Sequence, residues 1–174
     1  MTSKLKTDVL ETGSGSGTIA LNNQLSGMTS ASVPAGSVLQ VIHVKGSGSD
    51  ISTTSTSYVA SGLQASITPQ SASSKIMIIL DSISYTNGAI NSRGIGVSIY
   101  RGGSEPSPSM RGGVNRTNSG AWISIPYSVS ALDSPNTTNA VVYEPYFKCW
   151  GASGHFFVDH VESNPTITLI EIKG

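Results

Sequence analysis

The chain has 174 residues, of which only 11% are charged, and its 10 basic and 10 acidic residues give a formal net charge of zero. A sparse and balanced charge produces no long-range field that would attract phosphate backbones or anionic lipid, which argues against nucleic acid and membrane partners. The length suits one domain with one sizeable core, together with an extension.

The N-terminal segment, residues 1–33, differs in composition from the rest of the chain. It has few large apolar residues and contains the low-complexity run Gly13 to Gly17, so it buries too little apolar surface to fold alone. We interpret it as an attachment arm rather than a disordered tail, because a tail would carry more charge. Extended segments add readily to exposed sheet edges. The predicted partner-binding residues of the arm are its two strand-like pieces: Asp8, Val9, Leu10, Thr18, Ile19, Ala20 and Leu21.

From Ser37 onward, strand signals recur at short intervals, and no stretch shows sustained helical spacing of apolar residues. The runs rich in Val, Ile, Thr, Tyr or Phe are Ser37–Lys45, Tyr58–Thr68, Lys75–Tyr85, Arg93–Arg101, Ala121–Ala131, Asn139–Trp150, His155–Val161 and Thr166–Lys173. The turn-forming clusters between them include Gly46 to Asp50, Gly102 to Gly113 and Asp133 to Asn136. This pattern predicts an all-β head domain over residues 34–174: an antiparallel, jelly-roll-like β-sandwich of about eight strands.

Two patterns suggest a ligand but fail on their context. The spacing Gly15-x-Gly17-x-x-Ala20 fits a relaxed dinucleotide fingerprint, yet a strand-like piece follows where a helix should begin, so no cofactor is predicted. On a strand, His155 and Asp159 would share one face while His160 points to the other, so no metal site is predicted either.

Other single residues and motifs receive structural interpretations. His43, inside an apolar strand, is expected to be a core or interface residue, and Cys149 to be a buried, inert thiol. The two Arg-Gly-Gly tripeptides, which begin at Arg101 and Arg111, are expected to flank a surface loop. No G-x-S-x-G nucleophile elbow occurs, and the chain is predicted not to be an enzyme. Most of the aromatic residues that might bind sugar are expected in the core: Trp122, Tyr127, Tyr143, Tyr146, Phe147 and Trp150.

Several short segments resemble the small virion surface proteins of marine and freshwater phages, including phages of cyanobacteria. These segments are Lys6-Thr-Asp8, Ser14 to Ile19, Val33 to Val41, Ile67-Thr-Pro69, Ser73 to Ile76 and Leu132 to Pro135. The resemblance implies a homotrimer with a β-sandwich head and an N-terminal attachment region. Unlike long fibres, the chain has no repeated shaft between arm and head.

The function expected from these observations is a capsid decoration or cement protein on the virion surface, made in the cytoplasm of the bacterial host. Its partners would be other copies of itself and the phage major capsid protein or another virion protein. One alternative is the head of a short tail fibre that binds a host-surface glycan. Another is an unrelated carbohydrate-binding module.

Overall fold

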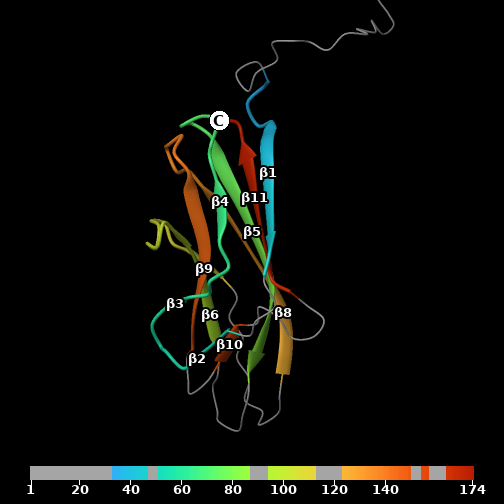
Figure 1. Ribbon diagram of the computed structural model, residues 1–174, viewed down its shortest axis with the longest axis vertical. Helices are drawn as coiled ribbons and strands as arrows, with labels where there is room; N and C mark the ends of the chain where they lie inside the picture. The colour runs from blue at the N-terminus through green and yellow to red at the C-terminus, as the bar shows by residue number, and fades with distance from the viewer. Residues whose placement is uncertain (1–32, 47–50, 87–93, 113–122, 150–153, 157–163) are drawn as a thin grey trace, which may run out of the picture. The chain divides into compact units, whose positions relative to one another are not determined.

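The computed structural model describes residues 33–46, 51–86, 94–112, 123–149, 154–156 and 164–174. These ranges contain eleven β-strands and no helix, so no helix that could cross a membrane occurs in them (Figure 1). The strands are β1 (Val38–Lys45), β2 (Ile51–Thr53), β3 (Val59–Ala60), β4 (Ala65–Ile67), β5 (Lys75–Thr86), β6 (Ile95–Arg101), β7 (Met110–Gly112), β8 (Ile123–Asp133), β9 (Val141–Cys149), β10 (Gly154–Phe156) and β11 (Thr166–Ile172). Apart from Val33, the predicted arm lies outside the described residues.

The strands form two antiparallel sheets within the unit Pro34–Gly174. In the first sheet the long strands lie in the order β1-β11-β5-β8, and β10 and β2 continue the sheet beside the second half of β5. In the second sheet β6 lies between β7 and β9, while β3 and β4 share the other side of β9. Strands distant in sequence are therefore neighbours, as β1 and β11 are.

This strand order is that of a jelly roll. To compare the strand order with a jelly roll, β3 and β4 are counted as one strand, and the short strands β2 and β10 are left aside. The eight strands that remain, renumbered 1 to 8 in chain order, lie in the order 1-8-3-6 in the first sheet and 2-7-4-5 in the second. Two such four-stranded sheets with Greek-key connections define the double-sheet jelly roll. The predicted fold class is confirmed.

The core lies between the two sheets and follows from the alternation of side chains along each strand. In β11, Ile167 and Leu169 are fully buried on the inner face. The alternate residues Thr168 and Ile170 are half-buried on the outer face. Large buried side chains of the second sheet, such as Phe147, complete the cluster. Each such side chain contributes roughly 1.5–3 kcal/mol on burial.

The predicted strand Tyr58–Thr68 is wrong as a single element. It is divided into β3 and β4 because Gly62 adopts a φ of 78°, in the left-handed region that glycine tolerates best. The Gly62 backbone N–H donates to Glu144 Oε1 over 2.7 Å, which holds this break against β9. Both halves still pair with β9.

The structure also contains strand residues at positions where the sequence predicted turns or loops, or predicted no strand. β7 lies within the predicted loop Gly102 to Gly113, because Met110 is buried and pairs with Ile99. β8 continues through Asp133, into a predicted turn, because the carboxylate of Asp133 binds Arg101 of the second sheet. β2 follows directly on the predicted turn at Gly46 to Asp50 and pairs with β10.

Candidate interaction surface

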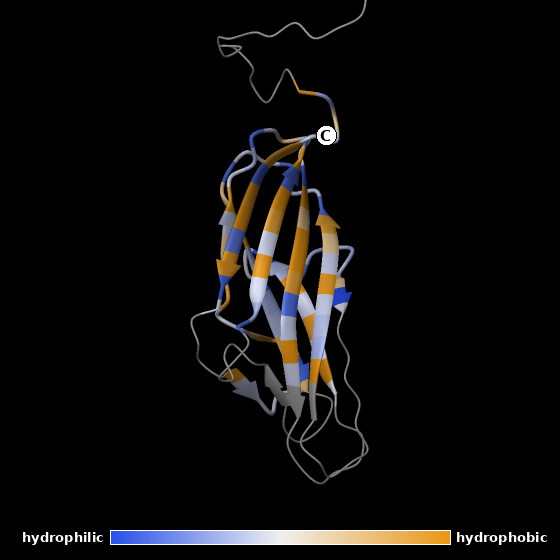
Figure 2. Cartoon of the chain, turned by 90° about the vertical axis from the view of Figure 1, so that its right-hand side faces the viewer, coloured by the Kyte–Doolittle hydropathy of each residue, from blue (hydrophilic) through white to orange (hydrophobic). Residues whose placement is uncertain are grey.

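The outer face of the first sheet, which points away from the second sheet, carries a row of apolar side chains. Val41 lies opposite Ile170, Ile170 opposite Met77, and Met77 opposite Leu132. The register thus aligns one apolar side chain from each of the four long strands, which lie side by side in Figure 2. Val41 is 56% exposed and Leu132 is 53% exposed, so the row faces solvent in the single chain.

A second apolar pair widens this row. Val38, which is 59% exposed, lies opposite Ile172. Three of the four exposed large hydrophobic side chains on the described surface therefore lie in this region. We define the apolar patch as Val38, Val41, Met77, Leu132, Ile170 and Ile172. Contiguous exposed apolar surface of this kind marks protein interaction sites.

The edges of the two sheets are poorly suited to adding another strand. β8 contains Pro126, which has no backbone N–H, and β1 has an irregular register between Val38 and Gln40. β7 is only three residues long. Proline, bulges and short edge strands are devices by which proteins prevent edge-to-edge pairing. The face of the first sheet is therefore a better contact surface than its edges.

A buried carboxylate supports the patch from the inner side of the sheet. Glu171, between Ile170 and Ile172, is fully buried and accepts hydrogen bonds from Gln40 Nε2 (2.6 Å) and the Gln70 backbone N–H (2.7 Å). Burial alone would raise the pKa of Glu171, but the interactions of its carboxylate with Ser74, Gln40 and the backbone of Gln70 and Ser71 outweigh burial and lower the pKa. The network joins β1, β11 and the β4–β5 connection, and so fixes two of the four strands that carry the patch.

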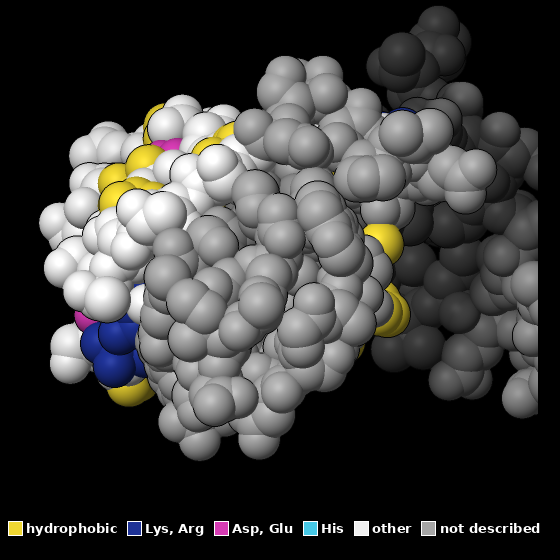
Figure 3. Space-filling view, turned by 90° about the horizontal axis from the view of Figure 1, so that it is seen from below, with side chains coloured by type: hydrophobic (Ala, Val, Ile, Leu, Met, Phe, Trp, Pro, Cys, Tyr) yellow, Lys and Arg dark blue, Asp and Glu magenta, His cyan; other side chains and the backbone are white. Residues whose placement is uncertain are grey.

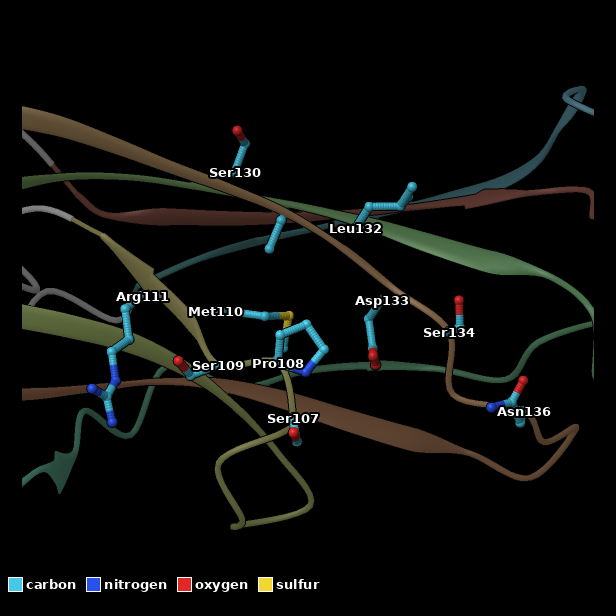
Figure 4. Close-up of a pocket in the computed structure, with 11 residues that line it drawn as sticks. Ser107, Pro108, Ser109, Met110, Arg111, Ser130, Leu132, Asp133, Ser134 and Asn136 are labelled. Atoms are coloured by element: carbon cyan, nitrogen blue, oxygen red, sulfur yellow. The ribbon is translucent and has the colours of Figure 1, made fainter.

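A groove of about 480 Å³ lies between the edge strands β7 and β8 (Figure 4). Asp133 points into it and is held by Arg101 Nη1, at 2.9 and 3.1 Å, and by the Tyr143 hydroxyl, which donates to Oδ2 over 2.7 Å. Burial and the Asp133 carboxylate raise the pKa of Tyr143. The groove is lined by Ser107, Pro108, Ser109, Met110, Arg111, Ser130, Ala131, Leu132, Asp133, Ser134 and Asn136. Its chemistry suits hydroxyl-rich ligands better than apolar ones.

A tyrosine cluster lies on the second sheet. Tyr100 stacks on Tyr146 with ring centroids 3.9 Å apart, and the ring centroid of Tyr58 lies 6.0 Å from that of Tyr100. The Lys148 ammonium lies 4.6 Å from the Tyr58 ring centroid. Viewed from below, Lys and Arg side chains gather beside acidic and hydrophobic ones at one side of the described surface (Figure 3). Because the rings contact one another and nearby cations, the cluster holds the segment before β3, which carries Tyr58, against β6 and β9.

The structure tests only part of the predicted sites. The seven arm residues from Asp8 to Leu21 lie outside the described residues, as do Asp159 and His160. Within the described ranges, no three His, Cys, Asp or Glu side chains are grouped so that they could hold a metal ion. The sequence did not single out the apolar patch, although the alternation in Lys75–Tyr85 contains its central part.

Single-residue expectations have mixed outcomes. Cys149 is buried, as predicted, and its thiol donates to the Thr53 carbonyl at 2.9 Å. His43 is not a core residue: it is exposed on the outer face, because Ile42 and Val44 take the inward positions, and its Nδ1 lies 2.9 Å from Thr168 Oγ1.

The aromatic and arginine predictions are partly confirmed. Tyr143 and Phe147 are fully buried and Tyr127 packs against the core, whereas Tyr146 lies in the tyrosine cluster. Trp122 and Trp150 lie outside the described residues. Arg101 is the last residue of β6 and Arg111 lies in β7, so the two arginines flank the loop between these strands, as predicted. Arg111 forms an ion pair with Glu105.

Comparisons with known proteins give little further information. No protein-family model matches the chain, and no curated protein matches it. Among solved structures, it is similar to a chain in the structure of infectious bursal disease virus Gx strain, with a TM-score of 0.33 and 13% sequence identity. The match covers 77% of this chain and 37% of that chain.

Proposed function

We propose that the chain is a non-enzymatic structural protein of a bacteriophage particle, displayed on the virion surface. The observation that carries this proposal is the exposed apolar patch on the outer face of the first sheet, which suits contact with another protein. Double-sheet jelly rolls occur in viral capsid domains and in lectins, so the fold is compatible with this function without deciding it. The resemblance of the sequence to phage virion proteins supplies the context.

In this proposal the protein is a capsid decoration or cement protein. Its arm, residues 1–33, binds the major capsid protein or another virion protein, and three copies associate as a homotrimer. Three linked arms bind far more tightly than one, because the second and third attachments are intramolecular. The protein would stabilise the shell through added contacts across its subunits.

The first test concerns assembly. We expect the full-length chain to sediment as a trimer at low micromolar concentration, because the phage virion proteins that its sequence resembles are homotrimers. Sedimentation equilibrium measures this directly. A monomer under these conditions would contradict the trimer.

The second test concerns attachment to the particle. Leu10→Asp and Ile19→Asp, made together in the full-length chain, should abolish co-sedimentation with particles that lack the native protein, since a charge in each strand-like piece opposes burial. Ser14→Asp, in the glycine-rich run between the pieces, is the control and should bind normally. Unchanged binding of the double variant would show that attachment does not use the arm.

A tail-fibre head that binds a glycan is the second candidate, favoured by the groove between β7 and β8. The groove offers hydroxyl groups together with the held carboxylate of Asp133. The two candidates differ in the copy number and position of the protein on the particle. Labelled particles imaged by electron microscopy would separate a shell location from a tail location.

A further inference from the structure

The outward side chains of β5 form a charge pattern that is complementary to itself after a half-turn. Lys75, Met77, Ile79 and Asp81 alternate with the buried Ile76, Ile78 and Leu80, so all four point away from the core. Lys75 and Asp81, at the two ends, are exposed, and the two apolar side chains between them are half-buried. The strand therefore presents positive, apolar, apolar and negative groups in order.

A twofold axis parallel to the sheet, perpendicular to β5 and level with Ile78 would bring two such faces together. Lys75 would then lie over Asp81 of the second copy, and Met77 over Ile79. Lys75 and Asp81 are six positions apart along the strand, a distance of about 20 Å, so the two ion pairs would lie on either side of one apolar centre. Stacked sheets pack about 10 Å apart, a distance that side chains of this size fill.

The neighbouring strands are compatible with the same axis. By register, Ile170 of β11 would lie over Thr168, and Val41 of β1 over His43. Lys45 of β1 also points outward. It would lie opposite Val38 of the second copy, so no like charge would face it. The arrangement thus covers the exposed apolar patch without placing two like charges in contact.

We infer that the outer face of the first sheet is an isologous contact surface that binds the same face of a second copy of this chain. The inference rests on the proposed function in one respect, namely that the protein acts through contacts with other proteins. It adds that one such partner is a second copy of the same chain. A twofold contact is self-complementary by definition, and the charge pattern of β5 has this property. It is distinct from the contacts within the proposed trimer, and it would join neighbouring trimers.

Charge reversal in the full-length chain tests the inference. The mass of the wild-type protein should at least double as its concentration rises to hundreds of micromolar, measured by sedimentation equilibrium. Lys75→Glu alone should weaken this pairing by about tenfold or more, because the introduced carboxylate would face Asp81 twice per contact. Asp81→Lys alone should weaken it similarly. Lys148→Glu, in β9 of the second sheet and outside this contact, is the control and should change the pairing less than about threefold.

Mixing the two single variants gives the decisive result. In a mixed pair, the new carboxylate at position 75 of one copy faces the new ammonium at position 81 of the other, and the native Asp81 faces the native Lys75. The Lys75→Glu and Asp81→Lys variants should therefore pair with each other more tightly than either pairs with itself. The chain that carries both substitutions should also recover self-pairing. Failure of the wild type to double in mass, or a mixture that pairs no better than the single variants, would overturn the inference. A trimer that persists without doubling would leave the proposed function standing while this inference fails.

Discussion

Replacing Glu171 by glutamine should lower the free energy of unfolding by about 3 kcal/mol, although the two side chains have the same shape. Both carboxylate oxygens of Glu171 accept hydrogen bonds, one from Gln40 Nε2 and one from the Gln70 backbone N–H. A glutamine amide offers one acceptor and one donor group, so it would direct an N–H group at another donor in a fully buried site. Chemical denaturation followed by circular dichroism measures the loss.

The loss should depend on pH in a defined direction. The pKa of Glu171 is lowered in the folded chain from an unfolded value of 4.5. Its contribution to stability is therefore fully present above about pH 4.5 and is lost as the pH falls through the lower, folded pKa. The difference in unfolding free energy between wild type and Glu171→Gln should be constant at neutral pH and shrink below pH 4.5.

Glu105→Gln is the matched control for this prediction. Glu105 pairs with Arg111 on the surface, where its side chain is 25% exposed and that of Arg111 is 54% exposed. Exposed ion pairs contribute at most about 1 kcal/mol, so this variant should lose far less stability. If both variants lost the same amount, the Glu171 network would not stabilise the fold in the manner described.

The sequence predicted the main strands because their alternation and turn residues are local signals. Lys75–Tyr85 is an example: β5 covers the predicted range and extends by one residue. The predictions failed where structure depends on distant partners. The break at Gly62 depends on Glu144, 82 residues away in sequence, and β7 forms because Met110 fills a place in the core.

The candidate surface was harder to predict than the fold. The run Ile76 to Leu80 indicated a strand with apolar residues on both faces, but no local signal shows which face packs against the second sheet. The apolar patch exists only when register aligns Val41, Ile170 and Leu132 across strands far apart in sequence. The arm predictions remain untested because those residues lie outside the described part of the chain.

Alanine at Ile78 should destabilise the protein strongly, whereas alanine at the adjacent Ile79 should not. Ile78 is fully buried between the two sheets, and truncation of a buried isoleucine to alanine costs about 3 kcal/mol through lost burial and the cavity left behind. Ile79 is half-buried on the outer face, where solvent can fill the space, so its truncation should cost less than about 1 kcal/mol.

Protein concentration then separates folding from association. At low concentration, where the outer faces are unpaired, denaturation should show the difference between Ile78→Ala and Ile79→Ala directly. At high concentration, pairing of the outer faces would add stability to the wild type by mass action, and Ile79→Ala should lose part of that increment. Equal destabilisation by the two substitutions at low concentration would contradict the assignment of inner and outer faces. A wild-type midpoint that does not change with concentration would show that the outer face remains unpaired in solution.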